Sequence, residues 1–274
     1  MLGYNFHANA LGLGGVLRSG GVKTTLPSLA SVVLAPAGGN GSAVVENYNA
    51  NGISFTRAES RVFGSEVSDT IFTTHSDVYI TNLTIFDRLR IALMSATLSS
   101  TRDVNLPDSA FEISLVYRGI SIDGAEIIPM LDGNLAGAPM FRDVQATLNG
   151  DVNNYAARFG LTPTALLDVI ENPSPREPIS GALVKELVVP NGVALTHSGH
   201  AIDVPGVGRA HFGEFLFKPG QRQVSLLRIK IGSGPPAGDT DGRNFSVMSI
   251  GGGDSGDLTG GYLEGNGSPP TGGG

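Results

Sequence analysis

Apolar and polar positions alternate along much of this chain, and the clearest case is a pair of segments near residue 220. Residues 210–217 and 223–231 are rich in Val, Ile, Leu and Phe, and they flank the tetrapeptide KPGQ. Pro219 presets φ near about −65° and Gly220 accepts a positive φ, which are the needs of the two central positions of a type II turn. The pattern predicts a β-hairpin.

Many other short segments show the same strand-like texture. They are residues 28–34, 52–56, 60–63, 71–84, 89–98, 111–117, 120–128, 183–189 and 193–196. Asp123-Gly124 suits a type I′ turn between two short strands. Because many short strands with turn residues between them are typical of layered β-proteins, we predict an all-β fold, an antiparallel β-sandwich or a barrel-like sandwich.

One region follows a helical pattern instead. Residues 152–160 and 162–171 predict two short helices. Thr162 can cap the second helix, Pro163 suits its first position, and Asn172-Pro173 ends it. We therefore expect a small two-helix insertion, residues 151–172, in a loop of the β-domain.

The N-terminal segment alternates as a half-buried strand does. Leu2, Tyr4, Phe6 and Ala8 share one side, after which the apolar phase slips to Leu11 and Leu13. Glycines at 12, 14, 15, 20 and 21 predict a flexible connection to the body. We thus expect three parts: an N-terminal extension strand (1–18), a β-sandwich domain (19–250) and a Gly-rich flexible tail (251–274).

Composition narrows the classes of function. The chain has 274 residues, 41% of them hydrophobic, which is enough for a core. The net charge of −7 without a basic cluster argues against nucleic acid as a partner. No apolar run approaches the ~18 residues of a membrane span. The absence of cysteine excludes disulfides and thiol nucleophiles.

Since the first residues lack the positive start of a signal peptide, we expect the numbering to begin on a processed or incomplete chain.

Two motifs resemble functional ones but are interpreted as coincidences. The tetrapeptide GDSG at 253–256, with His75, Asp103 and Ser255 in matching order, resembles a serine protease motif, but it lies in the Gly-rich tail, where a rigid oxyanion hole is not expected. Residues 156–167 resemble a helix-turn-helix, yet the second helix contains acidic residues and no Lys or Arg. We expect neither enzymatic activity nor DNA binding.

Metal binding has two candidate sites. Asp239, Asp241 and Asn244 place oxygen ligands as calcium loops do, although a solvated turn between strands is the alternative. The histidines at 197, 200 and 211 could form a zinc site, while solvent-facing or hydrogen-bonded histidines are the default interpretation. We expect no obligatory cofactor.

Four Asn-X-Ser/Thr sequences are potential N-glycosylation sites. They begin at Asn40, Asn82, Asn244 and Asn266. Chance occurrence is the alternative explanation.

The order of elements resembles the bacterial secreted domains known as choice-of-anchor P proteins. The matching residues are Gly3-Tyr4 at the start of an alternating strand, the segments 25–36 and 77–97, then 114–122, and IDVPGVG at 202–208 before the final hairpin. The likeness spans most of residues 3–233. It implies a surface or exported protein without established catalysis. The helical insertion and the lack of a hydrophobic sorting segment depart from that family, which leaves the attachment to a surface open.

These features favour a structural subunit of an extracellular fibre or surface assembly. The N-terminal strand could complete the sheet of a neighbouring copy, with Leu2, Tyr4, Phe6, Ala8, Leu11 and Leu13 as subunit contacts, so that copies polymerise head to tail. The alternative is a monomeric cell-surface binding or adhesion module for carbohydrate or protein. The lack of tryptophan supplies few stacking platforms for sugars.

Overall fold

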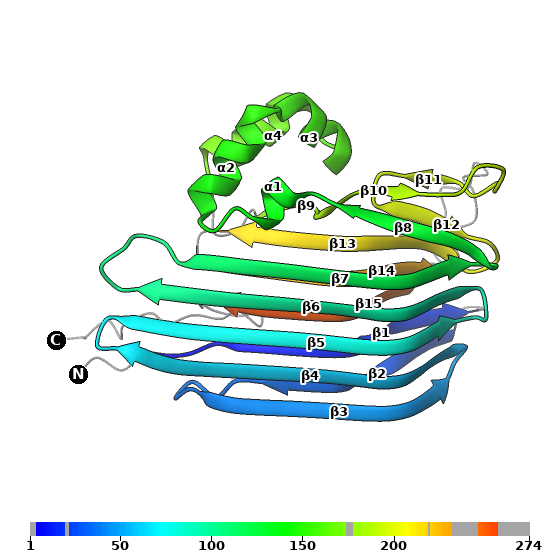
Figure 1. Ribbon diagram of the computed structural model, residues 1–274, viewed down its shortest axis with the longest axis horizontal. Helices are drawn as coiled ribbons and strands as arrows, with labels where there is room; N and C mark the ends of the chain where they lie inside the picture. The colour runs from blue at the N-terminus through cyan, green and yellow to red at the C-terminus, as the bar shows by residue number, and fades with distance from the viewer. Residues whose placement is uncertain (1–3, 20–21, 174–177, 219, 232–245, 257–274) are drawn as a thin grey trace.

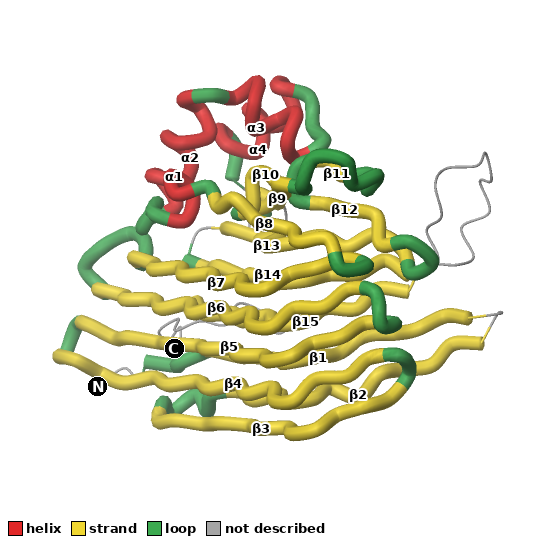
Figure 2. Tube along the Cα trace, turned by 45° about the vertical axis from the view of Figure 1, so that its right-hand side comes forward, coloured by secondary structure: helices red, strands yellow, loops and turns green. Residues whose placement is uncertain are grey.

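The computed structural model describes residues 4–19, 22–173, 178–218, 220–231 and 246–256. Two antiparallel β-sheets lie face to face, and a group of short helices sits at one end of them (Figures 1 and 2). The prediction of an all-β sandwich with a small helical insertion is confirmed.

Sheet A contains strands from both ends of the described chain. Its order is β11-β12-β13-β14-β15-β1-β2, with β9 also paired to β13. The bounds are β1 Ala8–Ser19, β2 Val22–Val33, β9 Ile179–Ala182, β11 His197–Ser198, β12 Ala201–Val204, β13 Gly208–Lys218, β14 Gln221–Ile231 and β15 Ser246–Gly256.

Sheet B is built mainly from strands that follow one another in sequence. Its order is β10-β8-β7-β6-β5-β4-β3. The bounds are β3 Gly39–Ala50, β4 Ile53–Ser68, β5 Ile71–Ile85, β6 Leu89–Asp103, β7 Ala110–Ile122, β8 Ala125–Leu131 and β10 Val184–Val188. The segment 193–196, predicted as a strand, lies in a loop before β11, and β3 was not predicted.

The two-residue period explains the core. In β5, every second residue from Phe72 to Ile80 is buried between the sheets, while the residues between them are less buried. Successive side chains of a strand point to opposite faces, so one apolar face of each sheet is enough to build the sandwich.

The predicted turns form as their residues require. Gly220 has a φ of 71° in the connection between β13 and β14, and Asp123 and Gly124 have φ values of 49° and 85° between β7 and β8. Two consecutive positive φ values are those of a type I′ turn. Both hairpins are confirmed, although Pro219 lies outside the described residues.

The helical insertion is larger than predicted. It contains α1 Gly133–Ala136, α2 Phe141–Gly150, α3 Val152–Phe159 and α4 Pro163–Glu171. The two predicted helices correspond to α3 and α4, and Thr162 Oγ1 accepts the Ala165 N–H at 3.1 Å, as an N-cap should. The sequence did not reveal the two additional helices. Asp132 Oδ1 caps α1 by accepting the Asn134 and Leu135 N–H groups, and Asp143 and Asp108 accept the Met140 and Phe141 N–H groups at the start of α2.

The N-terminal segment is part of its own sheet. β1 pairs with β2 on one side and with β15 on the other, so residues 8–18 are not a separate extension in this chain. The glycines that predicted a linker serve close packing instead: a Cβ added at Gly12 would lie 3.0 Å from the Cβ of Ala30 and 3.2 Å from that of Ala58. Residues 251–256 of the predicted tail belong to β15, and residues 257–274 lie outside the described residues.

The two ends of the sandwich differ. At one end both sheets finish in long strands, β2 in sheet A and β3 in sheet B, and we call this the open end (Figure 1, bottom). The other end contains the short strands β9, β10 and β11 and helices α1–α4, of which α3 packs against β9, and we call this the helical end (Figure 1, top).

Candidate functional site

A pocket of about 450 Å³ lies beside the hairpin β13–β14 of sheet A. His200, Glu214, Phe215 and Arg228 line it together with residues of β9 and α3. Ala210 and Phe212 point into the core, so His211 between them points to the outer face of the sheet. The pocket is therefore outside the sandwich core.

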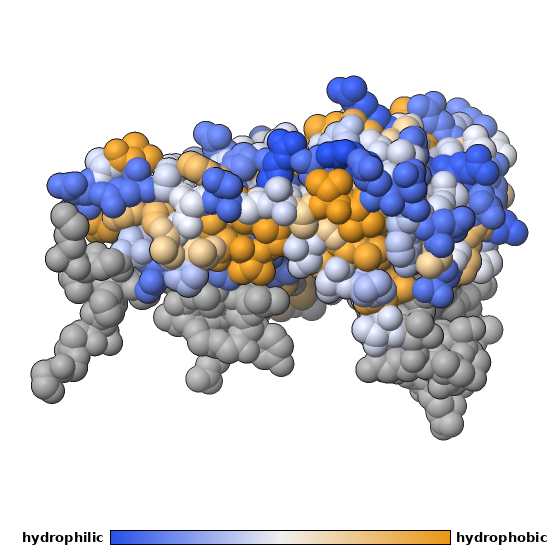
Figure 3. Space-filling view, turned by 90° about the horizontal axis from the view of Figure 1, so that it is seen from below, coloured by the Kyte–Doolittle hydropathy of each residue, from blue (hydrophilic) through white to orange (hydrophobic). Residues whose placement is uncertain are grey.

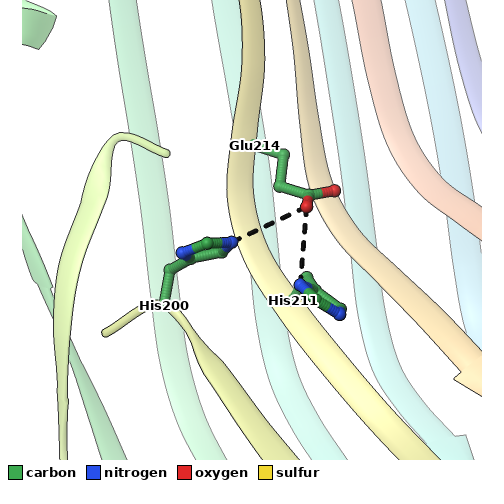
Figure 4. A group of neighbouring side chains, drawn as sticks. All are labelled: His200, His211 and Glu214. Carbon is green, nitrogen blue, oxygen red and sulfur yellow. Dashed lines mark ion pairs between the residues drawn. The ribbon is translucent and has the colours of Figure 1, made fainter. Parts of the chain in front are cut away.

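Two local features bring polar groups together there. Residue pairing aligns Ala201 with His211, which places His200 next to β13, and the Phe212 N–H donates to the His200 carbonyl at 2.9 Å. Gly213 has a φ of 63°, and this left-handed residue interrupts the alternation between His211 and Glu214. As a result, His200, His211 and Glu214 converge, as Figure 4 shows.

The three side chains are close and mostly buried. The Nε2 of His200 lies 3.6 Å from Oε1 of Glu214, and the Nδ1 of His211 lies 3.5 Å from the same oxygen. Arg228, opposite His211 in the ladder, donates from Nε and Nη2 to the two oxygens of Glu214. The carboxylate is thus shared between a guanidinium and two imidazoles.

Burial and neighbouring charges set the protonation of this group. Burial, with the nearby Arg228 charge, lowers the pKa of His211 to about 4. Burial raises the pKa of Glu214, but the hydrogen bond from Arg228 and the other cationic neighbours outweigh it and lower the pKa to about 2. At neutral pH, His211 is uncharged and Glu214 is ionised. Both ring nitrogens of His211 are buried without a hydrogen-bond partner.

The sequence singled out part of this cluster. The structure joins His200 to His211, but His197 lies exposed on β11 and outside the group. Glu214 was missed because residues three apart in a regular strand point to opposite faces, and only the positive φ at Gly213 changes that.

The predicted subunit-contact residues pack mostly within their own chain. Phe6, Ala8 and Leu13 are buried in the core, and Leu11 is partly buried. The Tyr4 ring stacks on Phe72 with centroids 4.0 Å apart. Leu2 lies outside the described residues. Their role between copies stays a prediction.

The open end is the second feature with functional potential. Val33 on β2 and Val44 on β3 are 55% and 43% exposed, and Leu29, Val45 and Tyr48 are only partly buried against the core. Figure 3, which views the molecule from below, shows hydrophobic residues gathered on this side. The core is therefore incompletely covered here.

The remaining predicted sites are placed apart from both features. Asn40 and Asn82 are exposed, on β3 and β5, which is compatible with a modification that stays a prediction. Asp239, Asp241, Asn244 and Asn266 lie outside the described residues. Among the residues that the structure describes, none of the helices combines the length and the apolar content needed to cross a bilayer.

His75 does not make the contacts of the predicted protease motif. Its Nε2 contacts Asp77 and its Nδ1 contacts Ser99 Oγ, each at 2.7 Å, whereas Asp103 accepts from Asn105. Ser99 lies in a central strand whose backbone pairs on both sides, so nearby N–H groups are committed to the sheet and form no oxyanion hole. The arrangement is a surface hydrogen-bond chain.

Comparison with known proteins identifies a family but no activity. Residues 4–166, more than half of the chain, match the model of DUF8256, which is described as a domain of unknown function. The chain therefore belongs to the DUF8256 family. No curated protein and no solved structure matches it. The resemblance to choice-of-anchor P proteins stays a prediction.

Proposed function

We propose that this member of the DUF8256 family is a structural subunit of an extracellular assembly whose copies join through the open end. The observation that carries the proposal is the pair of edge strands β2 and β3, each 12 residues long, in two facing sheets. Long edge strands leave a row of unpaired backbone groups, and proteins usually protect such edges with charge, Pro or a cover.

Protection at this edge is slight. β3 contains a single charged residue, Glu46, whose Oε1 is held by Arg57 Nη1 at 2.6 Å. Asn47, with a φ of 54°, interrupts its pairing with β4 without a shift of register. Partly covered apolar residues lie just behind the edge. A partner strand would satisfy backbone groups and cover these residues together.

A second copy of this chain is the partner that fits both layers. Stacked sheets lie about 10 Å apart, so a partner must offer two edges with that spacing to extend both sheets at once. The open end of another copy, related by a two-fold axis, offers this. Antiparallel pairing about a two-fold axis at Val45 places Glu46 opposite Val44 of the second copy, which keeps the two acidic side chains apart.

Concentration-dependent sedimentation tests the proposal. The wild-type chain should shift from monomer to dimer as concentration rises, and V33K/V44K should stay monomeric because Lys on edge strands blocks pairing. V188K is the matched control, since Val188 is 41% exposed on β10 at the helical end. A wild-type chain that stays monomeric, or equal association of V33K/V44K, would contradict the proposal.

Strand donation by residues 1–18 is the route to a fibre that the sequence suggested. Leu11 and Ser31 are paired across β1 and β2, and the chain contains no cysteine. The L11C/S31C variant, oxidised to a disulfide, would hold β1 in its own sheet. Donation requires that assembly cease in the oxidised form and return on reduction; equal assembly in both forms excludes it.

The extracellular location is inferred from the Gly-rich, turn-rich composition with only 16% charged residues. Antibody labelling of intact cells should detect the protein without permeabilisation. Labelling that requires permeabilised cells would contradict this part of the proposal.

The outer face of sheet B favours a second candidate function, carbohydrate binding. A shallow pocket of about 360 Å³ is lined by Glu59, Arg61, Asp77, Tyr79 and Thr97. Tyr79 is 40% exposed and could stack on a sugar ring, with the polar groups as hydrogen-bond partners. A glycan-array signal lost in Y79A and kept in F86A, which alters an equally exposed ring on a turn, would support it; an array without a signal would not.

A further inference from the structure

We propose that His200, His211 and Glu214 bind a divalent transition-metal ion such as Zn²⁺ on the outer face of sheet A. This site is independent of the proposed assembly, because β14, β15 and β1 separate it from the open end. Two imidazoles and a carboxylate are a donor set that zinc and related ions take in proteins.

The spacing of the donor atoms fits the ion. Zinc bonds of about 2.0–2.1 Å in a tetrahedral arrangement set neighbouring donor atoms about 3.3 Å apart. Glu214 Oε1 lies 3.6 Å from His200 Nε2 and 3.5 Å from His211 Nδ1, and the three donor atoms all lie within 4.8 Å of one another (Figure 4). Side-chain adjustments of a few tenths of an ångström would complete the site.

The state of His211 is the independent observation that points to a ligand. Both of its ring nitrogens are buried and neither has a hydrogen-bond partner. Buried polar atoms are normally satisfied, so each exception needs an explanation. An ion bound at Nδ1 would satisfy this atom.

Arg228 should weaken metal binding at this site, so replacing it gives the sharpest test of the proposal. Its guanidinium contacts both oxygens of Glu214, so it competes for the carboxylate and repels a cation, as does the charge of Lys230. Removal of this charge should strengthen metal binding. If the cluster were only an ion-pair network, the same change would leave Glu214 without its main partner and bring no metal affinity.

The site has three protein ligands and adjoins the 450 Å³ pocket. Three protein ligands leave at least one coordination position for water or another donor. We infer that an exchangeable ligand would enter from the pocket, between Phe215 and Arg228.

Titration with Zn²⁺ and with Co²⁺ tests the proposal on the full chain. We expect about one equivalent of metal and, for Co²⁺, the visible absorption of a low-coordinate site. His200→Ala and His211→Ala should each weaken metal binding by more than about tenfold. Replacing a residue that only supports a metal ligand already costs at least about tenfold in affinity, and removing a ligand should cost more. His197→Ala is the matched control, because this exposed histidine lies outside the cluster.

Arg228→Met should bind Zn²⁺ more tightly than the wild-type chain does. Circular dichroism and thermal melting show whether each variant is folded, and Arg228→Gln serves as a second variant that removes the charge and keeps a hydrogen-bond donor. Equal binding by the double variant H200A/H211A, or no binding by either the wild-type chain or a folded Arg228 variant, would overturn the proposal.

Discussion

The open end and the helical end complete the same sandwich in opposite ways. At the helical end the edge strands are short, β10 with five residues and β11 with two, and helices α1–α4 lie at the same end, with α3 against β9 (Figure 1). At the open end β2 and β3 have 12 residues each, and no element covers their backbone edges among the described residues. The difference teaches that this chain adds its own insertion at one end and keeps long edge strands at the other, where we propose that copies associate.

The helical end is also held by a nearly buried ion pair and an aromatic contact. Asp132 pairs with Arg158 at 2.5 Å, with the two side chains 7% and 15% exposed. Arg158 also donates to the Ala182 carbonyl at 3.2 Å, which ties α3 to β9. Phe159 packs edge-on against Phe215, with centroids 5.7 Å apart. The insertion is thus anchored to both sheets and closes the core.

The largest effect should come from breaking the buried pair at the helical end. Asp132→Ala leaves the Arg158 charge unpaired and removes the cap of α1, so it should lower the free energy of unfolding by about 3 kcal/mol. Chemical denaturation measures this. Arg88→Ala is the control, since its exposed pair with Asp123 should matter by less than about 1 kcal/mol. Equal effects would contradict the anchoring role.

The same pair should make the helical end sensitive to acid. Burial raises the pKa of Asp132, but the hydrogen bonds from Arg158 and the Leu135 N–H outweigh it and hold the pKa below its ordinary value of 3.8. The stabilisation is therefore fully present above pH 3.8 and is lost as the pH falls through the lower folded pKa. Denaturation across acidic pH should show this loss in the wild-type chain and not in Asp132→Ala.

A smaller effect is expected where the N-terminal segment packs near the open end. A Cβ at Gly64 would lie 2.6 Å from Leu34 Cδ2 and 2.9 Å from Phe6 Cδ1. Gly64→Ala should therefore destabilise the fold by about 2 kcal/mol through overpacking. Gly133→Ala is the control, because a Cβ there meets no atom within 4 Å. An unchanged midpoint in Gly64→Ala would show that Phe6 is not packed as described.

The smallest effect concerns the left-handed residue of β3. Asn47 has a φ of 54°, a conformation that costs alanine about 1 kcal/mol and glycine almost nothing. Asn47→Ala should be destabilised by about that amount in chemical denaturation, whereas Asn47→Gly should match the wild-type chain. Equal stability of the two variants would contradict a left-handed conformation at this position.

The sequence was informative where structure depends on neighbours along the chain. The Asp123-Gly124 turn, the hairpin around Gly220 and the cap at Thr162 all follow from local backbone preferences, and all were confirmed. β3 was missed because its sequence, GNGSAVVENYNA, has few apolar residues, as suits a strand at an exposed edge.

Long-range pairing could not be predicted in this way. Nothing near residues 8–19 indicates that they pair with residues 246–256, so the N-terminal strand was interpreted as an extension. The metal cluster was found in part, since the two histidines stand out by residue type, whereas Glu214 joins them only through the positive φ at Gly213.

The position of β15 between β1 and β14 has a consequence for the time order of folding. A ribosome or a secretion channel releases β1 early, yet one of its two neighbours emerges more than two hundred residues later. Sheet B consists largely of strands adjacent in sequence, so its strands can pair one after another as they emerge. Sheet A cannot form fully until Ser246–Gly256 is available. Sheet A would therefore stay incomplete while the chain emerges, and it would become continuous only when β15 pairs with β1 and β14.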